Sequence, residues 1–295
     1  MSTARLLGGI LSIFLSLFFL TLNLVILFIT ITDKKFSNGT YRIIKNMLVA
    51  SSIQLFTFLV GGVMTLAGST FNDYFMKLCG SFLAPGWFLF LFLSLTLALD
   101  RLIVFVSTNS NRFRFVFDRL LLGISWLVFA IYFVVLNLPA NGFLLLEPEL
   151  LIWNYQDGSD TFLTIGNILN YTFLVAVFVI YVVIFIILVN TKKSTTTLWS
   201  KPLNTEKRLL IVAIGSFLYE TTTIGSYHWV PRVIPDSDFV PMTMNLVWLI
   251  DCGVFAMCTV ALNTLIKRRI RSMIFRSTIS VTSMDNYVHH LSKPT

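Results

Sequence analysis

The sequence predicts an all-α membrane protein, a bundle of seven transmembrane helices with its N-terminus outside and its C-terminus inside. Three observations carry this prediction. The chain is 56% hydrophobic and only 12% charged, with a mean hydropathy of +0.81, whereas a soluble domain is about 25% charged. Seven stretches reach the roughly 20 apolar residues that a helix needs to cross a bilayer. Nineteen of the 22 Lys and Arg residues lie in connections on one side.

We expect a single transmembrane domain, residues 1–276, that contains all seven helices. The first run is about twice as long as the apolar core of a signal peptide and ends without a small-residue cleavage site, so we expect it to be retained. The predicted spans are 6–31, 43–66, 80–106, 117–138, 161–190, 209–230 and 240–266.

The basic residues then set the expected orientation. The first, third and fifth connections and the C-terminal segment hold nineteen of them, and the opposite side holds only Arg5, Lys77 and Arg232. Cytoplasmic loops are enriched in Lys and Arg, so the N-terminus should be outside. The basic C-terminal segment should be inside, and a chain that starts outside and ends inside needs an odd number of spans, which seven satisfies. The net charge of +8 therefore indicates topology and contact with anionic lipid rather than nucleic-acid binding.

A basic segment follows the seventh span. Within 267–276, three apolar residues recur at helical spacing beside five positive charges, so a short amphipathic helix should lie along the inner membrane face. Two roles stay open for it, a docking surface for a partner or a simple stop-transfer flank. Residues 277–295 are polar, and we expect a disordered cytoplasmic tail.

The second outer loop, 139–160, carries both acids and an apolar run. It contains no basic residue and four acidic ones, Glu147, Glu149, Asp157 and Asp160. Such a loop either packs over the mouth of the bundle or acts as a lid over a ligand cavity.

The chain offers little catalytic or metal chemistry. Its three cysteines are Cys79 near the start of the third span and Cys252 and Cys258 in the seventh, and the outer loop has no cysteine to pair with Cys79. We expect no disulfide. There is no Gly-rich phosphate loop, nucleophile elbow or metal-spaced His/Cys cluster. The sequence therefore predicts no enzyme, no metal site and no cofactor.

Two acids stand out because they lie at mid-membrane depth. Glu220 is 12 residues past Arg208, and Asp251 is 16 residues before Lys267. A charged residue at this depth costs about 2.5–3.5 kcal/mol, so both acids should face the bundle interior. They either form a ligand or Na⁺ site, make interhelical hydrogen bonds, or couple a transporter to protons.

Several further polar or aromatic residues could contact a ligand in the outer half of the bundle. Trp87 follows Pro85 and Gly86, where a bend in the third span would widen an outer cavity. Intramembrane amides more often join helices than bind ligands. The candidate ligand contacts are Trp87, Asn170, Tyr219, Glu220 and Asp251.

Asp100 and Arg101 end the third apolar run where the helix leaves the lipid. The simplest interpretation is an arginine that snorkels to the membrane surface. In seven-helix receptors the same pair is a latch, in which the acid holds the arginine until the receptor is activated.

At this point the chain resembles the serpentine chemoreceptors of nematodes, a divergent group of G-protein-coupled receptors, and class T most closely, with class X as the other candidate. The resemblance spans about residues 10–276. The order of the matching motifs along the chain is more specific to the family than any one motif alone. The matching segments are Thr40-Tyr41-Arg42-Ile43-Ile44, Cys79 with Pro85, Leu95-Thr96-Leu97-Ala98-Leu99-Asp100-Arg101, and Glu206-Lys207-Arg208-Leu209-Leu210.

The resemblance implies a chemosensory receptor that binds a small molecule such as an odorant, metabolite or pheromone and activates a heterotrimeric G protein. It also implies the plasma membrane of a sensory neuron, at its cilium. Our own hypothesis for the coupling surface combines the acid-Arg pair, the basic third inner loop and the segment after the seventh span, with the residues Asp100, Arg101, Lys207, Arg208, Arg268 and Arg269.

The chain departs from better known receptors in three places. Leu102 follows the acid-Arg pair where Tyr is common, the segment from Asn263 lacks the usual Pro and Tyr, and the sixth span lacks a Cys-Trp-x-Pro switch. Only the Asp100–Arg101 latch is therefore carried over. The alternative function is a small transporter or channel that uses Glu220 and Asp251.

Overall fold

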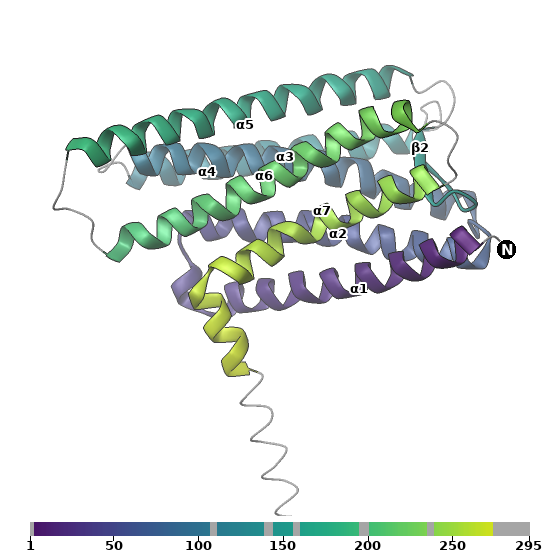
Figure 1. The fold of residues 1–295 in the computed structure, drawn as a ribbon, viewed down its shortest axis with the longest axis horizontal. Helices are drawn as coiled ribbons and strands as arrows, with labels where there is room; N and C mark the ends of the chain where they lie inside the picture. The colour runs from purple at the N-terminus through teal and green to yellow at the C-terminus, as the bar shows by residue number, and fades with distance from the viewer. Residues whose placement is uncertain are drawn as a thin grey trace, which may run out of the picture.

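The computed structural model describes residues 3–106, 111–138, 144–155, 160–194, 201–234 and 239–273. Seven helices in these ranges are long and apolar enough to cross a membrane. They lie roughly side by side in one bundle (Figure 1). Their bounds are α1 Thr3–Thr32, α2 Gly39–Ala67, α3 Asp73–Val106, α4 Asn111–Asn137, α5 Asp160–Ser194, α6 Lys201–Val233 and α7 Phe239–Leu262.

The two ends of the bundle differ, and we name them by what they carry. The hairpin end holds the N-terminus and two short strands, β1 Leu144–Glu147 and β2 Ile152–Tyr155. The basic end holds the connection from α1 to α2, with the 3₁₀ turn η1 Lys34–Phe36, and the segment after α7.

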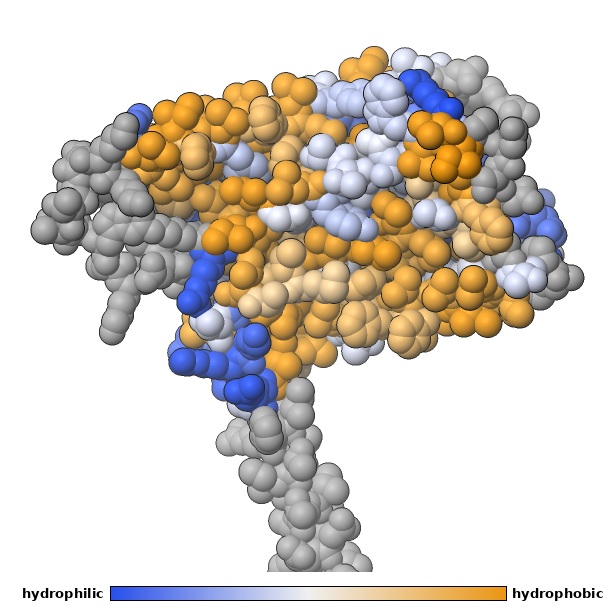
Figure 2. All heavy atoms as spheres, in the orientation of Figure 1, coloured by the Kyte–Doolittle hydropathy of each residue, from blue (hydrophilic) through white to orange (hydrophobic). Residues whose placement is uncertain are grey.

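The bundle turns apolar side chains outward over most of its length. Figure 2 shows a broad hydrophobic band, with hydrophilic side chains gathered over the segment after α7 at the basic end. Large residues such as Phe14 on α1 and Phe185 on α5 are 65% and 67% exposed. A soluble protein rarely exposes so large an apolar surface. Lipid covers such a surface, and helices satisfy their own backbone hydrogen bonds there.

Close approaches between helices depend on small residues. Gly253 on α7 lies against the Phe19 ring of α1, and a Cβ at this position would be 2.2 Å from the ring. A Cβ at Gly62 on α2 would be 2.9 Å from Ile13 of α1. Helices in membranes associate by such close packing of small residues. This packing joins α1, α2 and α7 on one side of the bundle.

The ends of α2 show why the chain turns where it does. The Asn38 side chain accepts a hydrogen bond from the Tyr41 N–H and so caps the helix start. At the other end Gly68 adopts φ +66°, and its N–H is directed at the carbonyls of Met64 and Thr65. A left-handed glycine in this position is a common helix stop.

Residues 144–155, in the connection from α4 to α5, form an antiparallel hairpin that packs onto the bundle. Leu144 pairs with Tyr155, and Leu146 pairs with Trp153. Leu144, Leu146 and Trp153 are buried in one cluster with side chains of α2, α3 and α7. The Leu144 carbonyl lies so close to Gly80 of α3 that a Cβ there would be 2.2 Å away. The loop therefore packs over this end of the bundle.

The seventh helix ends earlier than the sequence predicts. α7 stops at Leu262, and a second helix runs from 264 to 273 across the direction of α7 (Figure 1). The helix ends four residues before the predicted end of the span at 266 because the Asn263 side chain accepts hydrogen bonds from the N–H groups of Leu265 and Ile266 and so starts a new helix.

The helix at 264–273 has two faces, as an amphipathic segment should. Ile266 is buried and Ile270 packs against the core, while Lys267, Arg268 and Arg271 are exposed. The remainder of the predicted 267–276 segment and the predicted tail, 277–295, lie outside the described residues.

Candidate functional site

A buried ionic cluster closes the basic end around Asp100 and Arg101 of α3. Both side chains are fully buried. The Arg101 guanidinium donates to Asp100 Oδ2 from Nη2 at 2.5 Å and from Nε at 3.2 Å. Arg101 is therefore not a snorkelling arginine that extends into solvent, because its charge is held inside the bundle by the adjacent acid.

Two further residues complete this cluster, and the sequence analysis did not identify either as part of the site. Arg114 of α4 donates from Nε to Asp100 Oδ1 at 2.6 Å and from Nη2 to Thr40 Oγ1 at 2.7 Å. Thr40 of α2 donates to Asp100 Oδ2 at 2.9 Å and also contacts Arg101. One carboxylate thus joins α2, α3 and α4. We call Thr40, Asp100, Arg101 and Arg114 the ionic cluster.

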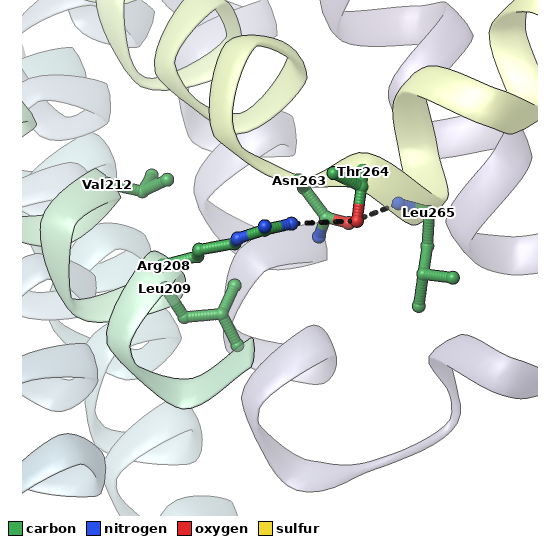
Figure 3. A pocket seen from close by; sticks show the side chains of 6 residues that line it. All are labelled: Arg208, Leu209, Val212, Asn263, Thr264 and Leu265. Carbon is green, nitrogen blue, oxygen red and sulfur yellow. Dashed lines mark hydrogen bonds between the residues drawn. The ribbon is translucent and has the colours of Figure 1, made fainter. Parts of the chain in front are cut away.

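A small hollow lies beside the junction of α7 and the helix at 264–273 (Figure 3). It is lined by Arg208, Leu209 and Val212 of α6 and by Asn263, Thr264 and Leu265. Arg208 extends across it and donates to Thr264 Oγ1 at 2.9 Å. The predicted coupling residue Arg208 therefore connects α6 to the start of the last helix.

Asn263 fastens the same junction to α2. Its amide nitrogen donates to the Tyr41 hydroxyl at 2.7 Å, while its oxygen caps the following helix. The other predicted coupling residues are less central. Arg268 is exposed, Arg269 pairs with Asp33 at 3.2 Å, and the side chain of Lys207 lies outside the described residues.

The two mid-membrane acids face the interior, as their cost in lipid requires. Glu220 is 2% exposed and Asp251 is 3% exposed. Ser94 of α3 donates to Glu220 Oε2 at 3.4 Å, and α7, which carries Asp251, packs against α6. Tyr219, beside Glu220, is half-buried. The structure brings α3, α6 and α7 together at this level.

Nearer the hairpin end, the indole of Trp87 donates to Asn170 Oδ1 at 3.0 Å, joining α3 to α5. Trp87 also contacts Trp248 of α7 in an edge-to-face arrangement, with ring centroids 5.6 Å apart. Trp87 and Ser94 are seven residues apart on α3, so the tryptophan lies about 10 Å from the acids along the helix. The predicted ligand contacts therefore form two levels of one interior.

Trp248 is the centre of the level nearer the hairpin end, and the sequence analysis missed it. Its indole N–H donates to Gln54 Oε1 at 3.1 Å, and Gln54 donates to the Gly86 carbonyl beside Pro85. Trp248 also makes edge-to-face contacts with Phe58 of α2 and Tyr227 of α6. This one side chain contacts α2, α3 and α6. We call Gln54, Trp87, Asn170, Tyr227 and Trp248 the aromatic hub.

The hairpin is tied down around the hub. The hydroxyls of Tyr155 on β2 and Tyr132 on α4 share a hydrogen bond of 2.9 Å. Burial raises the pKa of the Tyr155 phenol well above its ordinary value, so this pair stays neutral. Arg5 of α1 pairs with Glu149 in the hairpin turn at 3.1 Å. The hairpin therefore has both a polar and an apolar attachment to the bundle.

A second hollow lies apart from these groups. It occupies about 90 Å³ between α3, α4 and α5 and is lined by Phe88, Phe92, Val128, Tyr132, Phe162, Ile165, Gly166 and Leu169. Neither hollow is lined by a predicted ligand contact. Among the described residues, no group of three or more His, Cys, Asp or Glu side chains is arranged to hold a metal ion, and all three cysteines are free thiols.

Comparisons with known proteins agree with this architecture. The crystal structure of squid rhodopsin superposes with a TM-score of 0.70 and 11% sequence identity, covering 90% of this chain and 79% of that one. At this identity the likeness shows the fold alone. No curated protein sequence matches the chain. Residues 1–283 match the family described as serpentine type 7TM GPCR chemoreceptor Srt. Because this match covers nearly the whole chain, the protein belongs to the Srt family of serpentine chemoreceptors and is a multi-pass membrane protein with a G-protein-coupled receptor fold.

Proposed function

We propose that this receptor binds a small molecule from the hairpin end and activates a heterotrimeric G protein at the basic end. The observation that carries the proposal is the buried ionic cluster. It holds Arg101 inside the bundle through Asp100 and Thr40, and Arg114 binds the same two residues. A charged side chain held in this way can be released only by a rearrangement of α2, α3 and α4. We therefore take this arrangement as the resting state of the receptor.

The orientation follows from the distribution of charge. The connections at the basic end hold nearly all Lys and Arg residues, which favours the cytoplasm for that end. The hairpin end then faces outward, where a ligand arrives. For a chemoreceptor we place this membrane at the surface of a sensory neuron, in its cilium.

The aromatic hub is the best candidate for the part of the receptor that responds to ligand. Trp248 contacts α2, α3 and α6 from its position on α7. A ligand that displaced Trp248 or broke the Trp87–Asn170 hydrogen bond would change contacts on five helices together. Glu220, Asp251 and the neighbouring Tyr219 lie one level deeper and would favour a ligand with a polar or cationic group.

Activation is then a shift between two helix arrangements. A ligand shifts such an equilibrium only by the difference between its affinities for the two states. In the resting arrangement Arg208 is bonded to Thr264. Movement of α6 away from this contact would free Arg208, which is already exposed, and uncover the buried Arg101, while Arg268 and Arg269 lie on the adjacent helix.

The test is nucleotide exchange on purified heterotrimeric G proteins with the receptor in lipid nanodiscs, screened against pools of odorants and metabolites. We expect exchange with at least one pool, and loss of that exchange in Arg101→Ala. The matched control is Arg232→Ala, which removes an exposed arginine at the hairpin end. Exchange that survives Arg101→Ala would contradict the assignment of the coupling site.

The ligand site has its own test with the same assay. Trp248→Phe keeps an aromatic ring but removes the bond to Gln54, and Glu220→Gln removes one buried acid. We expect both variants to change the ligand concentration needed for half-maximal exchange while surface protein is partly retained. Complete loss of surface protein would indicate that these residues only hold the helices together.

The two buried acids favour one alternative function, a small transporter or channel. It predicts ligand uptake into proteoliposomes that stops in Glu220→Gln or Asp251→Asn. Ligand-dependent nucleotide exchange without uptake would exclude it.

A further inference from the structure

Asp118 of α4 is a buried acid that the ionic cluster does not use. Its side chain is 1% exposed, and neither of its carboxylate oxygens has a hydrogen-bond partner. A buried carboxylate without partners is costly, and native proteins rarely leave one unsatisfied. The position therefore calls for an explanation.

Asp118 lies one helical turn after Arg114, at the (i, i+4) spacing that places both side chains on one face of α4. The two could pair within their own helix. Instead, Arg114 reaches across to α3 and α2, where it binds Asp100 Oδ1 at 2.6 Å and Thr40 Oγ1 at 2.7 Å. Arg114 is thus bonded to the carboxylate of Asp100 and not to that of Asp118, one turn away on its own helix.

The groups around Asp118 include three arginines, none of which is hydrogen-bonded to it. Its Oδ2 lies against the backbone at Gly39, where a Cβ would be 2.6 Å away. The charged groups that act on it are Asp100, Arg114, Arg101 and Arg42. Arg42 lies over the Phe115 ring, and its Nη1 is buried without a hydrogen-bond partner. Among these groups only Arg114 shares a helix with Asp118 and is part of the ionic cluster.

We propose that Asp118 is the second acceptor for Arg114, which moves from Asp100 and Thr40 to Asp118 when the receptor opens. The inference rests on the proposed function, because it takes the ionic cluster as the resting state. In the resting state Asp118 lacks a partner. In the open state Asp118 would hold Arg114, while Asp100 would lose both of its arginines. Each state therefore leaves one buried carboxylate without an arginine partner, Asp118 at rest and Asp100 when the receptor is open.

This exchange of partners keeps the two states close in free energy. A switch works when its two arrangements differ by only a few kcal/mol, so that a ligand can shift the balance. A single acid would make the closed state much too stable. A second acid on the neighbouring helix offsets this stability and gives α4 a defined position in the open state. Asp118 is thus a positioning residue, and it need not contact the G protein.

The first test measures basal nucleotide exchange without any ligand. Asp100→Asn should open the receptor, and Asp118→Asn added to it should lower basal exchange about tenfold, the effect of one charge-assisted hydrogen bond. In the Arg114→Gln background, Asp118→Asn should have no effect. In the Arg42→Gln background its effect should persist. The proposal would be overturned if the effect of Asp118→Asn disappeared in the Arg42→Gln background and persisted in the Arg114→Gln background. It would also be overturned if Asp118→Asn changed nothing when added to Asp100→Asn.

The second test does not use a G protein. Asp118→Asn should raise the melting temperature of the purified resting receptor, because it removes an unpaired buried carboxylate. Asp73→Asn, at the exposed start of α3, is the control. A lower melting temperature would mean that Asp118 already has an essential partner at rest and would refute the exchange. If Asp100→Asn itself shows no basal exchange, the proposed function fails, and the melting result still decides the role of Asp118.

Discussion

Replacing Asp100 with asparagine should make the receptor active without ligand. The carboxylate accepts hydrogen bonds from Thr40, Arg101 and Arg114. Asparagine keeps the size and one oxygen of the side chain but removes its charge. Arg101 is fully buried, so the resting state loses the counter-charge that holds this arginine inside the bundle.

The magnitude follows from the burial of the pair. Removing one partner of a buried ion pair costs about 3–5 kcal/mol, whereas an exposed pair contributes about 1 kcal/mol or less. The Arg114 side chain is 23% exposed, so most of the effect comes from Arg101. A loss of about 3 kcal/mol in the resting state changes the equilibrium about 150-fold, at 1.36 kcal/mol per factor of ten. A receptor that is open about 1% of the time would become open roughly 60% of the time.

The assay compares basal nucleotide exchange per surface receptor for the parent, Asp100→Asn and Asp73→Asn. The last variant makes the same chemical change at an exposed position on the same helix. We expect high basal exchange only for Asp100→Asn. If Asp100→Asn reaches the surface normally and its basal exchange matches that of the parent, the ionic cluster is an anchor rather than a latch.

Three further predictions concern packing and capping. Gly80→Ala places a Cβ 2.2 Å from the Leu144 carbonyl, so it should lift the hairpin and make buried Cys79 reactive to a membrane-impermeant maleimide. Gly123→Ala, whose Cβ meets nothing within 4 Å, should leave Cys79 protected, and equal labelling of both variants would contradict the packing. Gly253→Ala should destabilise the receptor by about 1–3 kcal/mol through overpacking against Phe19. Phe19→Leu should partly restore the melting temperature, and Gly225→Ala is the neutral control. Asn263→Ala removes a cap and the bond to Tyr41, and should cost about 1–2 kcal/mol, whereas Tyr41→Phe should cost less; a larger loss from Tyr41→Phe would show that the cap is minor.

The number of helices and the burial of the two acids could be predicted because lipid imposes them. Seven long apolar runs can form only seven helices, and acids such as Glu220 and Asp251 must face inward wherever the helices lie. The pairing of Asp100 with Arg101 was equally accessible, since the two residues are adjacent. These predictions need only the depth of a residue in the membrane.

The partners contributed by other helices could not be predicted, because they depend on how each helix is rotated. Spans that are apolar on every face carry little periodic signal to indicate the buried side. From the sequence, Arg114 could therefore be assigned only to the basic side of the membrane. Trp248 was one aromatic residue in an apolar run, and nothing in the sequence marked it as a contact between helices. Thr40 appeared in the resembling segments but without a role. The break at Asn263 was missed because a polar residue near a helix end does not by itself reveal which N–H groups it caps.

The burial of the hairpin has a consequence for how fast this receptor can respond. Leu144, Leu146 and Trp153 belong to the same core cluster as residues of α2, α3 and α7, so a ligand that arrives from this end must wait until these contacts open locally. Opening is a first-order event, so the observed binding rate should level off at high ligand concentration. At low ligand concentration, the apparent association rate constant should lie below the usual range of about 10⁵–10⁷ M⁻¹s⁻¹. Once bound, a ligand is retained by the same barrier. A cell carrying this receptor would average over brief pulses of an odour and report its sustained presence.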